Sequence, residues 1–479
     1  MLKKYFSGKD TPFWLVTLSV VIFLTLTKLI QDGMFMDGML YTCVSHNLSK
    51  GIGTFWLPVF SPSYFNSGSP FFLEQPPLVF GIQSLFFKVL GDSMYVERVY
   101  IFLTMCITAF LIYLLWKIIY NEENEIRRIG WLPVFLWITI PSCSWSYSNN
   151  MMENTMGLFS LAAVISAIKA GESEKYRPGL LILSGFLVFL ATLSKGVPGL
   201  FPLTVPFLYW IIIRKKTILY AFISTIIILL VPVVIYFILF RLPESRESLT
   251  FYVTQRLLGR INDDPTVGSR FYILKRLITE LIPQIIFVAI IIISAKIKNP
   301  KIQFISHLRY SILFLSIGLA ASAPLILTLV QRGFYLVPSF PYFALGFSVI
   351  VAPMILTLRE KLSNNPKKHK ILLNVSIIVF AFAILFTAML KGKTSRDKDK
   401  LHDVYAIGKE IPGNSAITIT QDLAPDYVLG CYFIRYFNIS LFIDEPKEYY
   451  MIKKTTGFSN KAYEKLEIET SLYDIYRRK

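Results

Sequence analysis

The sequence is short of charged residues and of cysteine, and each shortage argues against a class of protein. Charged residues make up 17% of its 479 positions, whereas soluble domains carry about a quarter. The four cysteines have neither the spacing of a metal site nor the pattern of a disulfide framework. No segment is of low complexity and no internal repeat is present. A soluble globular enzyme, a zinc module and a disulfide-rich secreted domain are therefore all disfavoured.

Hydrophobic residues make up 54% of the sequence and give a mean hydropathy of +0.53. Apolar runs of about 18 or more residues recur along most of the chain, as membrane-spanning helices require. We therefore predict an α-helical polytopic membrane protein with about eleven spans. The first run is interpreted as an uncleaved span, because its apolar part is too long for a signal peptide and lacks a small-residue cleavage site. The predicted spans are residues 12–31, 98–118, 129–147, 151–169, 179–194, 197–213, 217–240, 281–296, 308–330, 335–357 and 371–390.

The net charge of +18 would suggest a nucleic-acid partner if the basic residues formed one surface. They lie instead in short loops between alternate spans, for example at 214–216 and 359–370. This asymmetry is typical of cytoplasmic loops, so we predict a cytoplasmic N-terminus and no nucleic-acid partner. An odd number of spans then leaves the C-terminus outside. The compact loops favour a bacterial inner (cytoplasmic) membrane.

Three segments do not read as spans. Residues 32–97, rich in proline and glycine, predict a long first external loop with two amphipathic helices, starting at Asp37 and Pro76. Residues 241–280 form a second, Arg-rich external loop, and 391–479 a small α/β domain. In that domain 416–420, 439–443 and 449–452 have the pattern of extended chain and 426–437 that of a helix. The chain thus divides into a transmembrane domain, 1–390, and an extracytoplasmic domain, 391–479.

Three carboxylates fall at the predicted outer surface: Asp37, Glu74 and Glu153. A carboxylate beside the bilayer is costly unless it faces a cavity or a partner, so each is a candidate functional group. The alternatives are structural. Asp37 can serve as a helix N-cap, and Glu153 as a charge favoured by the dipole of its helix.

Cations at the same surface form a second set of candidates. Lys195 lies in a short external turn, where the positive-inside rule disfavours it. Fixed cations at headgroup depth suit a phosphate group, although ordinary solvent or headgroup contact also explains single basic residues. The basic and aromatic candidates are Lys195, Arg256, Arg260, Arg270, Lys275, Arg276, Arg332, Tyr41 and Tyr335, of which Lys195, Arg256, Arg270 and Arg332 are favoured.

Several short motifs occur in a definite order. An acid opens a helix after the first span (Asp37), Glu-Gln-Pro-Pro follows at 74–77, Glu153 comes after the third span, and Leu-Ser-Lys-Gly-Val-Pro at 193–198. Later come DDPTVGSRFYILKRLITELIP and QRGFYLVPSFPYFAL. Together they resemble polyprenyl-phosphate-dependent glycosyltransferases of the GT-C superfamily, in the branch of the protein O-mannosyltransferases and lipid A aminoarabinose transferases. The resemblance covers residues 10–360.

This resemblance implies that Asp37 is the catalytic carboxylate near the acceptor and that Lys195 lies near the donor phosphate. Glu74 would be a metal ligand or an organiser of the carrier phosphate, and Glu153 a second acid. The family commonly has Glu-Lys-Pro-Pro where this chain has Gln75, and often a second acid where it has Gly38. Both departures affect what the resemblance implies about the identity of the substrate more than what it implies about the type of reaction.

We therefore predict an integral-membrane glycosyltransferase that moves a sugar from a polyprenyl-phosphate carrier to a lipid, glycan or protein acceptor. A general base, Asp37, takes the acceptor proton, and cations or a metal stabilise the leaving phosphate. A divalent metal ion is kept as an alternative cofactor, because Glu74, Glu153 and His46 would form a ligand set if they converged. No His/Cys spacing indicates such a site. The alternatives are a transporter or flippase of a lipid-linked saccharide, which needs polar groups near mid-bilayer, and an O-antigen-type ligase or polymerase.

Overall fold

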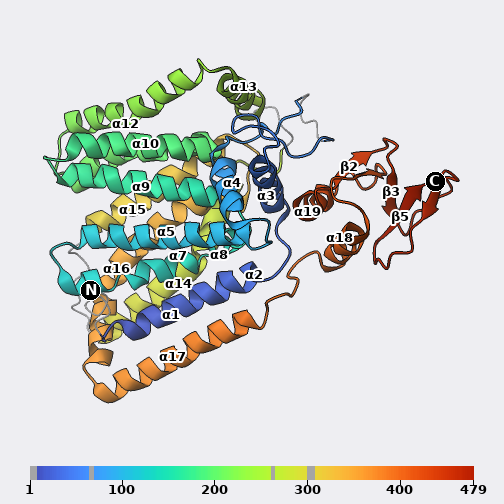
Figure 1. Cartoon of the computed structure of the whole chain (residues 1–479). Coiled ribbons are helices and arrows are strands. Elements are labelled where there is room, and N and C mark those ends of the chain that lie inside the picture. The colour runs from blue at the N-terminus through green and yellow to red at the C-terminus, as the bar shows by residue number, and fades with distance from the viewer. Residues whose placement is uncertain (1–7, 64–68, 260–264, 299–307) are drawn as a thin grey trace.

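The computed structural model describes residues 8–63, 69–259, 265–298 and 308–479. A bundle of long helices makes up most of the molecule, and a small segment of helices and strands follows it at one end (Figure 1). Within the described residues, nine helices are long and apolar enough to cross a membrane. They are 11–29 (α1 Thr11–Val21, η2 Ile22–Leu26 and α2 Thr27–Leu29), α5 (Val96–Ile119), α9 (Met152–Glu172), α10 (Arg177–Lys195), α12 (Ile218–Leu239), α14 (Tyr272–Lys298), 308–327 (α15 Leu308–Ser322 and η7 Ala323–Leu327), 333–363 (η8 Gly333–Ser339 and α16 Phe340–Ser363) and α17 (Pro366–Ala388).

The prediction of about eleven spans is corrected at two segments, 129–147 and 197–213. The first is divided into α7 (Trp131–Ile138) and α8 (Pro141–Ser146), because Pro141 holds Ile140 in an extended conformation. The second follows Gly196 and contains three prolines, so it forms the short pieces η3 (Val197–Thr204), α11 (Val205–Leu208) and η4 (Tyr209–Ile213). Neither is a regular spanning helix.

The first of these segments nevertheless connects opposite ends of the bundle. Before α7, in the short helix α6 (Asn124–Arg128), Glu125 pairs with Arg359, which also holds Asp10 near the N-terminus. After α8, Asn149 accepts a hydrogen bond from the Phe35 amide at the other end. We call the end that carries residues 30–95 and the C-terminal segment the loop end, and the opposite one the N-terminal end (Figure 1).

The peripheral helices of the bundle and the buried ones differ in composition. α12 and α17 are apolar on almost every face and lie at the periphery, as lipid contact requires. α9 is the most buried of the nine and carries small residues that permit close packing against its neighbours. On α10, Gly185 lies so close to the Ile228 carbonyl of α12 that a Cβ there would clash. The core of the bundle therefore forms around α9 and α10.

At the loop end, α3 (Met36–Ser49) and α4 (Leu78–Leu90) follow the predicted starts at Asp37 and Pro76 to within two residues. The amphipathic character predicted for both helices is seen in α4 but is wrong for α3, which is buried on nearly all sides by protein. The second predicted loop contains α13 (Pro243–Phe251) and η5 (Tyr252–Leu258). Its last part, 272–280, belongs to α14, so that span begins earlier than predicted. Arg260 lies outside the described residues.

The C-terminal segment contains a five-stranded mixed sheet in the order β2-β1-β3-β5-β4. β1 pairs in parallel with β2 and β3, whereas β5 pairs antiparallel with β3 and β4. The elements are α18 (Lys398–Glu410), β1 (Ala416–Ile419), α19 (Tyr427–Phe437), β2 (Ser440–Ile443), β3 (Tyr449–Lys453), β4 (Tyr463–Lys465) and β5 (Tyr473–Arg478). α19 packs against α3, which brings the end of the chain next to its first loop.

Candidate active site

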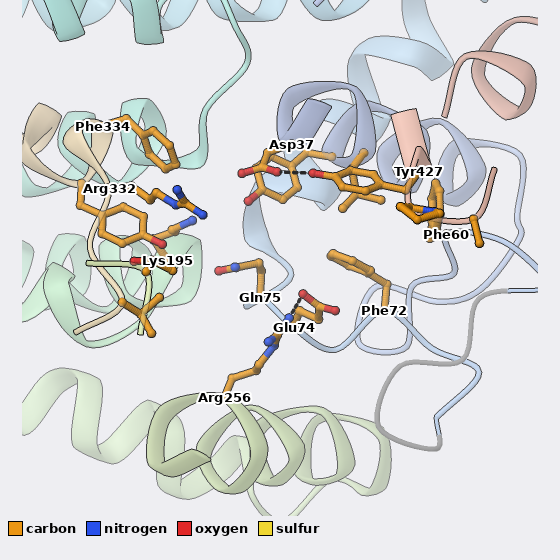
Figure 2. Close-up of a pocket in the computed structure, with 17 residues that line it drawn as sticks. Asp37, Phe60, Phe72, Glu74, Gln75, Lys195, Arg256, Arg332, Phe334 and Tyr427 are labelled. Carbon is orange, nitrogen blue, oxygen red and sulfur yellow. Dashed lines mark hydrogen bonds and ion pairs between the residues drawn. The ribbon is translucent and has the colours of Figure 1, made fainter. Parts of the chain in front are cut away.

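The loop end contains a cavity of about 470 Å³. Its wall combines segments that are far apart in the sequence: the first loop, the end of α10, η5, the approach to η8 and the start of α19. Figure 2 shows carboxylate, cationic and aromatic side chains around one space. The lining residues are Asp37, Leu40, Tyr41, Phe60, Phe72, Glu74, Gln75, Lys195, Arg256, Thr266, Val330, Arg332, Phe334, Tyr335, Ala424, Pro425 and Tyr427.

Asp37 lies in the first turn of α3, with its side chain half-buried at the cavity wall. It is not the N-cap, because that position belongs to Phe35 and the helix has no side-chain cap bond. Its Oδ1 accepts a hydrogen bond of 2.8 Å from the Tyr427 hydroxyl. The next residue, Gly38, packs against the chain after α8, where a Cβ would come within 1.9 Å of the Asn149 carbonyl oxygen. The helical turn that carries Asp37 thus packs closely against the chain after α8, and this close packing requires glycine at position 38.

Lys195 and Glu153 form a buried ion pair. The Lys195 Nζ lies 3.2 Å from the Glu153 Oε1, and the two side chains are 8% and 1% exposed. Within the described residues neither Glu153 oxygen has a hydrogen-bond partner, so the contact has the distance of an ion pair without hydrogen-bond geometry. The ammonium group also lies 5.7 Å from the centre of the Tyr41 ring and 5.8 Å from the centre of the Tyr335 ring. Glu153 does not line the cavity itself; it holds the lysine that does.

Local structure explains how Lys195 reaches the cavity. It is the last residue of α10, and Gly196 follows with φ of 86°, which turns the chain away. The Tyr252 hydroxyl of η5 occupies the place that a Cβ at Gly196 would take. The Leu-Ser-Lys-Gly motif is therefore a helix end that projects its lysine at the loop end.

A second ion pair joins Glu74 of the first loop to Arg256 of η5. Both side chains are partly exposed and both line the cavity. Gln75 lies beside this pair, and Arg332 and Lys195 lie on the opposite side of the cavity from Tyr427 (Figure 2). The cavity wall thus carries one carboxylate paired with a cation, Glu74 with Arg256, and two further cations, Arg332 and Lys195, away from that pair.

Burial raises the pKa of the Tyr41 phenol well above its ordinary range, and the charges of Asp37 and Glu153 raise it further. The phenol therefore stays protonated at neutral pH, as a hydrogen-bond donor and an aromatic wall beside Lys195.

Of the predicted site residues, eight line the cavity: Asp37, Tyr41, Glu74, Gln75, Lys195, Arg256, Arg332 and Tyr335. Glu153 adjoins it through Lys195. Arg270 does not line it; its side chain is exposed, and its carbonyl accepts a hydrogen bond of 2.8 Å from Gln331, the residue before Arg332.

The residues considered for a metal site do not fit one. His46 lies 3.0 Å from Asp92, while Glu74 pairs with Arg256 and Glu153 with Lys195. Burial, followed by the charge of Arg435, lowers the pKa of His46, which keeps its ring neutral at pH 7. In the described parts of the chain, no three His, Cys, Asp or Glu side chains are grouped as metal ligands. We therefore derive no catalytic step through a metal.

Sequence reasoning missed the residues that the C-terminal segment contributes, namely Ala424, Pro425 and Tyr427. The helix that starts near 426 was predicted, but no motif linked its first residue to Asp37. The aromatic wall of Phe60, Phe72 and Phe334 was also missed, because single aromatic residues are common in an apolar chain.

Solved structures of other proteins share this architecture. The chain shares its fold with ArnT from Cupriavidus metallidurans, solved with bound undecaprenyl phosphate. The two chains are 13% identical, with a TM-score of 0.63 over 96% of this chain and 97% of that one. The apo form of the same protein gives 0.62 at 13% identity, with the same coverage. The Archaeoglobus fulgidus oligosaccharyltransferase in complex with Zn and sulfate is more distant, with a TM-score of 0.48 at 11% identity, covering 92% of this chain and 68% of that one.

Residues 74–236 match the family model described as dolichyl-phosphate-mannose-protein mannosyltransferase. No curated protein matches the sequence significantly. The predicted GT-C resemblance is confirmed: residues 74–236 match this family model, and the chain is a multi-pass membrane protein with the fold of ArnT.

Proposed function

We propose that the chain transfers a sugar from a polyprenyl-phosphate carrier to an acceptor hydroxyl at the outer face of a bacterial inner membrane, with inversion at the anomeric carbon. Asp37 is the general base of this reaction. Lys195 and Arg332 bind the phosphate that links the sugar to its carrier. The acceptor is a lipid, a glycan or a protein.

The observation that carries the proposal is that Asp37 and several cations line a single cavity, in which the second carboxylate, Glu74, is paired with Arg256. In Figure 2, Asp37 lies between Tyr427 on one side and Lys195 and Arg332 on the other. A volume of about 470 Å³ is within the range of small-molecule sites. An acceptor hydroxyl at Asp37 and a phosphate at the two cations would thus both lie next to a sugar held in the cavity.

The reaction needs one displacement. Asp37 takes the proton of the acceptor hydroxyl, whose oxygen forms a bond to the anomeric carbon of the sugar. The bond from that carbon to the carrier phosphate breaks, and the phosphate keeps the electron pair. Lys195 and Arg332 stabilise the charge that develops there. A single displacement from the opposite face inverts the anomeric centre.

The remaining residues support these two groups. Glu153 forms an ion pair with Lys195. The attraction between the two charges is stronger here than in water because both side chains are buried. Glu74 fixes Arg256 at the cavity wall, where the arginine adds positive charge near the carrier. Tyr41 and Tyr335 lie near Lys195 and restrict where its ammonium group lies. Gln75 offers the substrate an uncharged amide. Arg270 has no part in the proposal.

Sugar transfer is tested by comparing the lipids and surface glycans of cells that carry the gene with those of cells from which it is deleted. Mass spectrometry should find an acceptor that loses one sugar mass on deletion and regains it when the gene is restored. The carrier-linked sugar should accumulate in the deletion strain. Identical glycan and lipid profiles would contradict the proposal. Purified protein that moves labelled lipid-linked sugar across liposomes without altering it would replace the transferase by a flippase, and loss of a whole chain would indicate a ligase or polymerase.

A further inference from the structure

The C-terminal segment supplies part of the cavity wall next to Asp37. Ala424, Pro425 and Tyr427 line the cavity although they lie almost 390 residues beyond Asp37 in the chain. The Tyr427 hydroxyl donates a hydrogen bond of 2.8 Å to the Asp37 Oδ1. A hydroxyl that bonds to a carboxylate forms a charge-assisted hydrogen bond, which is stronger than a neutral one.

Both partners of this bond stand at the start of a helix. Asp37 is the second residue of α3, and Tyr427 is the first residue of α19. The two helices pack against each other, and the Cys43 thiol of α3 donates to the Cys431 carbonyl of α19 at 3.0 Å. The geometry of the Asp37–Tyr427 pair therefore follows from the packing of two rigid elements.

A buried network holds the far part of α19 to the transmembrane bundle. The Arg435 guanidinium, 1% exposed, pairs with Glu97 of α5 at 3.0 Å and donates to the Ser93 carbonyl at 2.9 Å. On the same helix, the Tyr436 hydroxyl donates to the Asp32 Oδ1 at 2.8 Å. These bonds fix α19 independently of Tyr427, so the Tyr427 hydroxyl is not needed to dock the helix.

We propose that Tyr427 is a positioning residue for the transfer reaction, and that the C-terminal segment thereby completes the acceptor side of the active site. The inference rests on the role of Asp37 in the proposed function. By holding Oδ1, the hydroxyl stops the carboxylate from rotating and presents Oδ2 to the acceptor. The side of the cavity that binds phosphate, at Lys195 and Arg332, does not depend on this bond.

The test replaces Tyr427 by phenylalanine, which removes the hydroxyl and keeps the ring. Two quantities are measured: the rate of product formation in membranes that contain the native donor and acceptor, and the affinity of the purified full-length protein for undecaprenyl phosphate. Tyr427→Phe should lower the rate about 10- to 100-fold, as expected for loss of one charge-assisted bond. Its affinity for undecaprenyl phosphate should not change.

Tyr436→Phe is the matched control, since it removes a hydroxyl-to-carboxylate bond of the same length from the same helix but outside the cavity. It should retain the wild-type rate even if it melts at a lower temperature. An equal loss of rate in both variants would overturn the inference in favour of a purely structural role, and so would weaker carrier binding with an unchanged rate. Asp37→Asn separates this inference from the proposed function. If Tyr427→Phe transfers at the wild-type rate while Asp37→Asn abolishes transfer, only the role of Tyr427 is overturned. If both variants transfer at the wild-type rate, the role of Asp37 as the base is overturned as well.

Discussion

At the scale of single residues, the chain departs from its relatives in a way that its own packing explains. The related enzymes often carry a second acid after the first, where this chain has Gly38. The backbone carbonyl of Asn149 occupies the space that any side chain at Gly38 would need. A second acid is excluded here by the close contact between α3 and the chain after α8. Sequence alone shows the glycine but not the carbonyl that requires it.

The buried Lys195–Glu153 pair gives a test in which stability and binding respond differently. Lys195→Met leaves the Glu153 carboxylate buried without a counter-charge, which should cost about 3–5 kcal/mol of stability. The double variant Lys195→Met/Glu153→Gln buries no unpaired charge, so it should regain most of the thermal stability. It should not regain affinity for undecaprenyl phosphate, because the cation that we propose to bind the phosphate is still missing.

Thermal unfolding in detergent and carrier binding measure the two effects. Lys50→Met, which removes an exposed lysine at the same end, should change neither by much. A double variant that binds undecaprenyl phosphate with wild-type affinity would remove Lys195 from the phosphate site.

At the scale of elements, Asn150 ties the first loop to the bundle. It has a left-handed conformation with φ of 52°, and its Nδ2 donates to the Thr42 hydroxyl at 2.9 Å and to the Gly38 carbonyl at 3.2 Å. It also exchanges hydrogen bonds with Gln83 of α4. One buried amide thus bonds to both helices of the loop.

Asn150→Asp keeps the shape and removes the donors, so a carboxylate would face the Gly38 carbonyl. We expect a loss of about 1–3 kcal/mol or more in stability, with a fall in activity as α3 shifts. Asn414→Asp is the control, because Asn414 is also left-handed, with φ of 65°, but exposed. Melting temperatures of the two variants that fall together would contradict the role given to Asn150.

Elements with one dominant local pattern were predictable from the sequence. Apart from α14, which begins at Tyr272 instead of 281, the long apolar helices lie close to their predicted positions, and so do β1, α19, β2 and β3 in the C-terminal segment. The errors come from interactions that are not local. The prolines of 129–147 and 197–213 interrupt helices whose composition suits a span, and α3 is buried by protein from segments distant in sequence. Of the cavity, the order of the motifs predicted the charged residues of the first 335 positions but not the wall supplied by 424–427.

At the scale of the whole molecule, the two ends of the bundle differ in charge. The N-terminal end carries the basic loops, including 214–216 and 359–370, whereas the loop end carries the cavity and the C-terminal segment. The orientation predicted from this asymmetry, and the division into 1–390 and 391–479, stay predictions. A membrane-impermeant maleimide tests the first of them.

Lys367→Cys and Asn414→Cys place exposed thiols at opposite ends of the bundle, in a protein whose exposed Cys106 is replaced by serine. On intact cells, the cysteine at 414 should be labelled, and the one at 367 should react only after the membrane is permeabilised. Labelling of 367 in intact cells would reverse the orientation and place the cavity in the cytoplasm.

The most direct test of the central claim concerns the carboxylate in the cavity. Asp37→Asn removes the base but keeps the size of the side chain and the cations of the cavity. Asp92→Asn serves as the control, since Asp92 is a carboxylate of the same loop that pairs with Lys50 outside the cavity. Sugar transfer in membranes and undecaprenyl phosphate binding are measured for both. We predict that Asp37→Asn transfers sugar at least about 100-fold more slowly while binding the carrier as the wild type does. Transfer at the wild-type rate in Asp37→Asn would contradict the account.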